Sequence, residues 1–214
     1  MIFFPFSEVI ESICMLLSFV YLSNGKVGYW SYFRWFMLFT VALELTGFTL
    51  YFVYHLNNHW LYNINLPIEF AFVSGVLYKI CSPYFKVLVW LVPGFLLFTG
   101  FYLYESINSH FTLYSVISNN IASVIIIIIS CFYFYHFLKK EEYVNIYQHP
   151  PFWIITGLFF FYFGSTACNV FYNYLASINL KQQIPVRFIT FAILNFILYS
   201  CWIRAFLCKY RQTI

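Results

Sequence analysis

Long apolar blocks separated by short polar turns follow one another along the whole chain. Each block holds about 20 residues, the length that a helix needs to cross a hydrocarbon core of roughly 30 Å at 1.5 Å per residue. The connections contain the turn formers Asn, Ser, Gly and Pro. The pattern predicts an all-α protein, one domain over residues 1–214, in which seven helices span a membrane. The blocks occupy residues 2–22, 31–54, 60–80, 85–104, 112–138, 152–176 and 186–207.

Neither a closed β-barrel nor a cleaved signal peptide fits the local pattern of these blocks. A barrel needs segments of about ten residues in which apolar and polar side chains alternate, and five consecutive isoleucines at 125–129 break that alternation. A cleaved signal peptide begins with basic residues and ends in a small-x-small site, and the first block has neither. We therefore expect the first block to be retained as a helix.

The composition supports a membrane protein. Of the 214 residues, 63% are hydrophobic and only 8% are charged, whereas soluble domains carry about 25% charged residues. So few charges cannot cover a surface that faces water, and we expect most of this surface to contact the lipid bilayer. The formal net charge of +4 does not call for a nucleic acid partner, because basic residues at helix ends can lie beside anionic lipid headgroups.

The basic residues predict the orientation of the helices, because Lys and Arg accumulate in cytoplasmic loops. With seven spans, Lys181 and Arg187 fall on one side of the membrane and the other nine of the 11 basic residues on the opposite side. The amino terminus is therefore predicted outside and the carboxyl terminus in the cytoplasm. Tyr and Trp near the block ends, Tyr62 among them, are typical of interfacial belts. The nine are Lys26, Arg34, Lys79, Lys86, Lys139, Lys140, Arg204, Lys209 and Arg211.

Polar side chains inside the spans are the candidates for function, since an acidic residue at the centre of a membrane helix costs about 2.5–3.5 kcal/mol. Glu44 and Glu69 lie near the middle of the second and third blocks, and Glu11 lies in the first. Asn65 precedes Glu69 by one helical turn and shares its face. We predict that all of these residues bind a ligand, together with four from later blocks. Those four are Asn119, Asn169, Asn195 and Tyr199.

These polar positions fall mainly in the outer half of the predicted bundle, whereas residues 124–129 and 158–161 make the inner half apolar. We therefore predict an outward-facing polar pocket with an apolar floor. No Lys or Arg lies at the depth of Glu44 or Glu69, so we expect these acids to be protonated or to bind a cation or an amine. Alternatively, each acid bonds a nearby Asn, Ser or Tyr and only stabilises packing, or the acids move protons or ions. The fourth block, almost without polar residues, is predicted to be the most lipid-exposed.

Signatures of catalysis are sparse, and no catalytic residue is predicted. His55 and His59 are four residues apart, a spacing that can place two imidazoles on one zinc ion, although Asn57 and Asn58 favour a helix break between them. No H-E-x-x-H motif, nucleophile elbow, P-loop or dinucleotide fingerprint is present. The alternative functions are thus a metal-dependent, lipid hydrolase-like membrane enzyme and a small proton- or cation-coupled transporter using Glu44 and Glu69. The seventh block has no central lysine for retinal, so we expect no cofactor besides zinc in the hydrolase alternative.

Two stretches carry a resemblance to a known group. They are Asn-His-Trp-Leu-Tyr-Asn-Ile at 58–64 followed by Pro-Ile-Glu-Phe at 67–70, and Pro-Phe-Trp-Ile at 151–154 leading to Phe-Gly-Ser at 163–165. The chain resembles small, uncharacterised seven-helix bacterial inner-membrane proteins and is similar to membrane-sensing regions of some signalling proteins. The resemblance implies a multi-pass protein of the bacterial inner (cytoplasmic) membrane.

The favoured hypothesis is a non-enzymatic sensor or accessory subunit whose pocket binds a small ligand or lipid. We expect no output domain after the last block, so such a sensor would act through a separate cytoplasmic or membrane partner protein. The sequence indicates neither the ligand nor the oligomeric state.

Overall fold

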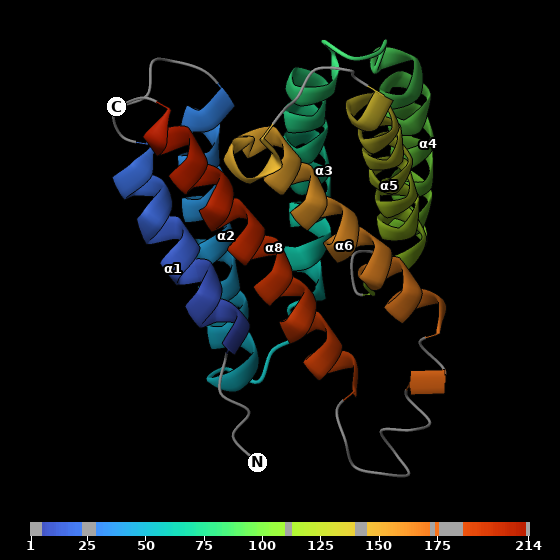
Figure 1. Cartoon of the computed structure of the whole chain (residues 1–214). Coiled ribbons are helices and arrows are strands. Elements are labelled where there is room, and N and C mark those ends of the chain that lie inside the picture. The colour runs from blue at the N-terminus through green and yellow to red at the C-terminus, as the bar shows by residue number, and fades with distance from the viewer. Residues whose placement is uncertain are drawn as a thin grey trace.

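The computed structural model shows helices that run up and down in alternation and stand side by side in a bundle (Figure 1). It describes residues 6–22, 29–109, 113–139, 145–171, 174–175 and 186–212. Over these residues every regular element is helical, and each predicted block contains one long element, so the all-α prediction is confirmed. The elements are α1 (Phe6–Tyr21), α2 (Tyr29–Phe52), α3 (His59–Cys81), α4 (Leu88–Ser109), α5 (Val116–Lys139), the 3₁₀ turn η1 (Ile146–Gln148), α6 (Pro150–Val170) and α8 (Val186–Arg211).

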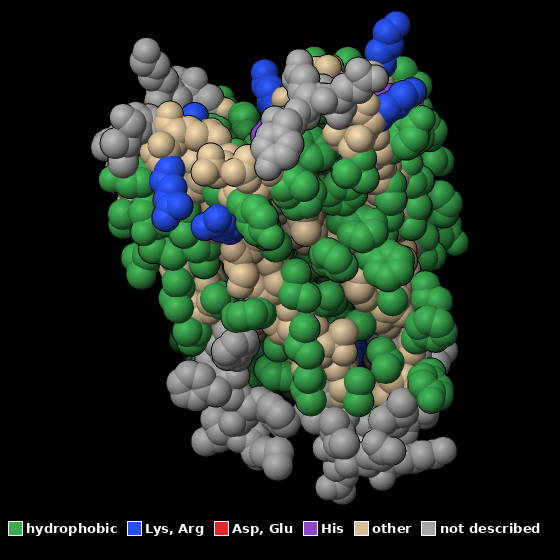
Figure 2. Space-filling view, viewed as in Figure 1, with side chains coloured by type: hydrophobic (Ala, Val, Ile, Leu, Met, Phe, Trp, Pro, Cys, Tyr) green, Lys and Arg blue, Asp and Glu red, His purple; other side chains and the backbone are tan. Residues whose placement is uncertain are grey.

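Six helices, α2 to α6 and α8, are long and apolar enough to cross a membrane. The 16 residues of α1 span about 24 Å at 1.5 Å per residue. Large apolar side chains cover the outside of the bundle, as Figure 2 shows for one face, and Leu96, for example, is 71% exposed. Soluble monomers rarely expose apolar patches of this extent. The helices therefore indicate a multi-pass membrane protein.

The helices pack in an order that leaves α3 inside and α4 at the edge. α6 packs against α5 and α8, α8 against α1, α1 against α2, and both α3 and α4 against α5. In the most apolar stretch of α3, 50% of the residues are buried inside the bundle, whereas in that of α4 only 17% are. The prediction that the fourth span is the most exposed is thus confirmed among the six long helices.

Serine and threonine hydroxyls are accommodated inside these apolar helices by bonds to their own backbone. The buried Ser130 hydroxyl, for example, donates to the Ile126 carbonyl at 2.8 Å. Such a bond satisfies the hydroxyl where water is absent. The same bond, to the carbonyl four residues earlier, is made by Ser12, Thr40, Thr46, Thr49, Thr99, Ser123, Thr156, Thr166 and Thr190.

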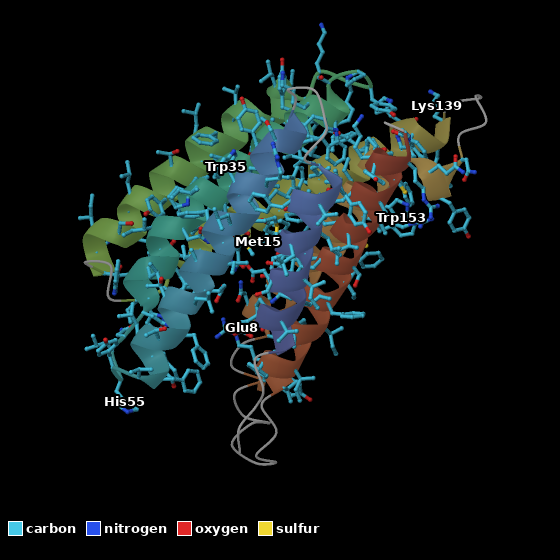
Figure 3. The ribbon with its side chains drawn as sticks, turned by 90° about the vertical axis from the view of Figure 1, so that its left-hand side faces the viewer. Glu8, Met15, Trp35, His55, Lys139 and Trp153 are labelled. Carbon is cyan, nitrogen blue, oxygen red and sulfur yellow. The ribbon has the colours of Figure 1, made fainter. Side chains whose placement is uncertain are left out.

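Lys and Arg side chains gather at one end of the bundle, which we call the basic end (Figure 2). Lys26, Lys140 and Lys181 lie outside the described residues. Of the other eight, only Arg187 lies at the opposite end, in the first turn of α8. We call this end the turn end, after the turn at residues 53–58. Figure 3 shows Lys139 at the basic end and His55 at the turn end. The remaining residues of the basic end are Arg34, Lys79, Lys86, Arg204, Lys209 and Arg211.

Glycine allows α6 and α8 to approach closely. A Cβ atom at Gly157 would lie 3.0 Å from the Cys201 Cβ and 3.2 Å from the Leu198 carbonyl oxygen. Atoms on or next to the backbone cannot move aside unless the two helices separate. Gly157→Val should therefore lower the free energy of unfolding by about 1–3 kcal/mol, measured by reversible unfolding in SDS. Gly75→Val is the matched control, because nothing lies within 4 Å of a Cβ built there; equal losses in both variants would contradict a role for this close approach.

Candidate ligand-binding cavity

A cavity of about 910 Å³ lies between α2, α3, α5, α6 and α8. At the turn end its lining includes Asn58, His59 and Arg187, and it extends inward to Val73 and Trp202. The distance along α3 from His59 to Val73 is about 21 Å at 1.5 Å per residue. The cavity therefore penetrates beyond the middle of the bundle from the turn end.

Seven of the eight residues predicted to bind a ligand line this one cavity. Glu11, the eighth, is buried in α1 and shares a side-chain hydrogen bond with Tyr199. On α3 the lining residues recur at three- to four-residue spacing, which places them on one face of the helix. The seven are Glu44, Asn65, Glu69, Asn119, Asn169, Asn195 and Tyr199.

The central acid of α2 is bonded to α3. The Tyr62 hydroxyl donates to the Glu44 carboxyl at 2.9 Å, and the Asn58 amide donates to the Gly47 carbonyl at 3.2 Å. Gly47 leaves room for the tyrosine, because a Cβ there would lie 2.8 Å from the Tyr62 hydroxyl oxygen. Tyr62, predicted in an interfacial belt, also lines the cavity. Its helical position alone does not tell which neighbouring helix it faces.

The central acid of α3 is bonded to α6. The Tyr162 hydroxyl donates to Glu69 Oε1 at 2.7 Å, and the Asn65 amide nitrogen lies 3.4 Å from Oε2. Tyr162 is buried. A further bond, 3.0 Å from the Asn169 amide to Asn120 Oδ1, joins α6 to α5. Each central acid therefore has a tyrosine donor from another helix, which is the kind of partner that the packing alternative predicts.

Acidic side chains predominate among the ionisable groups in and around the cavity. Glu11 and Glu44 are close enough to interact, and both also interact with Glu8 and Glu69. Ionised carboxylates at such separations repel one another strongly in a low dielectric unless a cation or a proton compensates. Arg187 supplies a positive charge at the rim, where its guanidinium lies 5.6 Å from the centre of the Phe191 ring. The deeper part of the lining is acidic.

Asn63 takes part in a group of hydrogen bonds at the turn end that was not predicted from the sequence. We call this group the polar clasp; it joins Asn63, Tyr102 and Glu105 to residues between 113 and 118. The Asn63 side chain is fully buried, donates to the Leu113 carbonyl at 2.7 Å and accepts from the Ser115 N–H at 2.9 Å. Pro67, four residues later, has no N–H for the Asn63 carbonyl, and the Tyr102 hydroxyl donates to that carbonyl at 3.0 Å. The proline is the one sequence signal that indicates an extra donor here.

Glu105 on α4 completes this clasp at the start of α5. Its carboxyl accepts from the N–H of Ile117 at 3.0 Å, from the N–H of Ser118 at 2.8 Å, and from the Ser118 hydroxyl. The first N–H groups of a helix lack partners within the helix, and a carboxylate there also interacts favourably with the helix dipole. The clasp therefore fixes the end of α5 that contributes Asn119 to the cavity.

The two histidines proposed as metal ligands do not share a helix. α2 ends at Phe52 and α3 begins at His59, and His55 lies between them with a positive φ of 54°. The predicted break is therefore confirmed, and the four-residue spacing does not place the imidazoles on one helical face. His59 lines the cavity. Within the described ranges no group of three His, Cys, Asp or Glu side chains is placed to hold a metal ion.

Several lining residues were not among the predicted ligand-binding residues. Tyr114 precedes α5, and Ser165 and Phe161 lie on the face of α6 that also carries Tyr162. They carry no charge or unusual spacing that would have identified them before the helices were placed side by side.

Compared with models of protein families, with curated proteins and with solved structures, the chain gives no significant match. The resemblance inferred from its motifs therefore stays a prediction.

Proposed function

We propose that this protein is a non-enzymatic sensor or accessory subunit of the bacterial inner membrane that binds a small ligand or lipid in the cavity. One observation carries the proposal: a space of about 910 Å³ is retained inside the bundle. Small-molecule sites measure about 300–1,000 Å³, and protein interiors otherwise contain few voids larger than a water molecule. Side chains that served only packing would fill such a space.

The lining also supports a sensor, because it belongs to five helices. The bonds from Tyr62 to Glu44 and from Tyr162 to Glu69 join α2 to α3 and α3 to α6. A ligand that contacts these acids would change the balance between bonds to the ligand and bonds between helices. If it favours one helix arrangement, it shifts the population toward that arrangement. A partner protein at the basic end could then detect the shift.

The proposed topology has seven spans, with the basic end in the cytoplasm and the cavity facing outward. Support comes from the asymmetry of the described basic residues, because only Arg187 lies at the turn end and Lys and Arg accumulate on the cytoplasmic side. α1 is the seventh span in this proposal, since it packs along α2 and α8 inside the same bundle.

Blocking the cavity should abolish ligand binding. In detergent, wild-type protein is expected to melt at a higher temperature with at least one compound from a panel of amines, alcohols, fatty acids and metal ions. Ser165 lines the cavity and is buried on α6, so Ser165→Trp places an indole in this space and should remove the response. Phe160→Trp, on the exposed face of the same helix, should keep it. A panel without effect, or an equal response in Ser165→Trp, would show that the cavity is not a binding site.

A second candidate, a small proton- or cation-coupled transporter, is favoured by one specific observation. Glu11, Glu44 and Glu69 each bond a tyrosine on a different helix, so a change in their charge would loosen contacts between helices. Purified protein in liposomes would then move protons or cations, whereas a sensor would bind its ligand without flux.

A further inference from the structure

We infer that the cavity ligand is an organic ammonium compound, in which a positively charged amine is attached to an apolar group. The inference rests on the proposed binding function and names its class of ligand. The cavity combines acidic side chains with unpaired acceptor atoms and aromatic walls, and each of these three features selects against a different class of ligand.

Charge selects against anions. Glu44 and Glu69 line the cavity, with Glu11 behind Tyr199. Among the lining residues that the structure describes, Arg187 is the only Lys or Arg, and it lies at the rim. A carboxylate or phosphate in the deep part would add to the repulsion between the acids, whereas an ammonium group would relieve it. Charge-assisted bonds from an ammonium to carboxylate oxygens are also among the strongest in proteins.

Unpaired atoms select for a donor. The amide nitrogen of Asn65 faces Glu69, which leaves Oδ1 as the acceptor, and no described residue donates to this buried atom. Glu11, which does not line the cavity but bonds the lining residue Tyr199, has a second acceptor, Oε1, that is buried without a donor among the described residues. An ammonium has donors and no acceptor, so it satisfies atoms of this kind. Within the described part of the chain, the Trp202 indole N–H in the floor is instead a donor without an acceptor, and a hydroxyl or ether oxygen on the apolar group would satisfy it.

Aromatic side chains select for an organic cation over a bare metal ion. Faces of Trp, Tyr and Phe attract ammonium groups, and cages of such rings recognise organic cations. The same rings provide the apolar contact that the remainder of the ligand needs. Such rings in the lining include Phe36, Tyr62, Phe161, Tyr162, Tyr199 and Trp202.

Three compounds of nearly equal shape test this inference on the purified full chain. They are phenylbutylamine, its neutral isostere phenylbutanol and the anion phenylbutyrate, each titrated by isothermal calorimetry. Hydrogen bonds to charged groups are stronger than those between neutral groups. The amine should therefore bind about tenfold more tightly than the alcohol. Glu44→Gln and Glu69→Gln should each reduce this ratio toward one. Phe160→Trp changes an exposed side chain that does not line the cavity and should leave the ratio unchanged.

The outcomes separate this inference from the proposed function. If phenylbutanol or phenylbutyrate binds the wild type as tightly as the amine, the ligand class is wrong while the binding function stands. If no compound of the wider panel stabilises the wild type, the binding function fails and this inference with it. If the Gln variants do not fold, the ratio of amine to alcohol affinity measured on the wild type still tests the class of ligand.

The ammonium could belong to a free amine or to a lipid headgroup. Nanodiscs of phosphatidylglycerol alone and of phosphatidylglycerol with phosphatidylethanolamine distinguish these sources. A headgroup ligand raises the melting temperature only in the second membrane and competes with phenylbutylamine. A free ligand gives equal melting temperatures in both membranes. Stabilisation by phosphatidylethanolamine that persists unchanged in the Glu44→Gln, Glu69→Gln double variant would overturn an ammonium site in the cavity.

Discussion

Asn63→Leu is expected to lower the free energy of unfolding by about 1.5–4.5 kcal/mol. Leaving the buried Ser115 N–H unpaired costs about 1–3 kcal/mol, and losing the bond to the partly buried Leu113 carbonyl costs about 0.5–1.5 kcal/mol. The Asn63 side chain is 0% exposed and bonds the Leu113 carbonyl and the Ser115 N–H. Leucine has a similar size but no polar atom, so both groups would lose the partner that Asn63 provides, and the Ser115 N–H would be left buried without one. Reversible unfolding in SDS measures the loss.

Two further variants show whether the clasp explains the loss. Asn63→Asp keeps an acceptor for the Ser115 N–H, and only its protonated carboxyl also keeps a donor for the Leu113 carbonyl, so its stability should approach that of wild type as the pH is lowered. Asn108→Leu makes the same change at an exposed position of α4 and should alter stability by less than about 0.5 kcal/mol. A stability of Asn63→Leu close to that of wild type would rule out the clasp as a main source of stability.

Glu105→Ala should have the second largest effect, a loss of about 1.5–3 kcal/mol, as for a helix cap formed with a charged group. The variant removes the acceptor for the N–H groups of Ile117 and Ser118 and for the Ser118 hydroxyl. The first turn of α5 should therefore fray, and amide hydrogen exchange at 117 and 118 should accelerate. Exchange in the middle of α3 is the internal reference, because opening of the whole protein would accelerate both sites equally.

Glu105→Gln distinguishes charge from hydrogen bonding at this cap. Glutamine keeps one acceptor oxygen but has no charge, so the loss of stability should be smaller than in Glu105→Ala. An equal loss in both variants would assign the whole effect to the charge.

The sequence predicts the helices well because crossing a membrane imposes a minimum length of continuous apolar residues. The largest differences are at the ends of α4 and α6. α4 continues to Ser109, beyond the predicted limit at 104, because polar residues such as Glu105 can extend a helix as long as the backbone bonds continue. α6 ends at Val170 instead of 176, and residues 172–173 and 176 lie outside the described ranges.

The candidate site could be predicted only one helix at a time. Spacing along α3 places Asn65 and Glu69 on one face, and the structure brings both to the cavity. Pairs such as Tyr62 with Glu44 and Tyr162 with Glu69 depend on how neighbouring helices are rotated about their axes. A single sequence does not give that rotation, because membrane helices that pack on one another do not show a contrast between polar and apolar faces as surface helices do.

The depth of the cavity has an electrical consequence. In the proposed orientation, an ammonium group that reaches Glu69 from outside has crossed part of the membrane, and it therefore crosses part of the membrane voltage. A full crossing by one charge is worth about 2.3 kcal/mol per 100 mV; half of that distance would contribute about 1 kcal/mol. A potential that is negative inside would strengthen binding, so occupancy would report the energised state of the cell together with the ligand concentration.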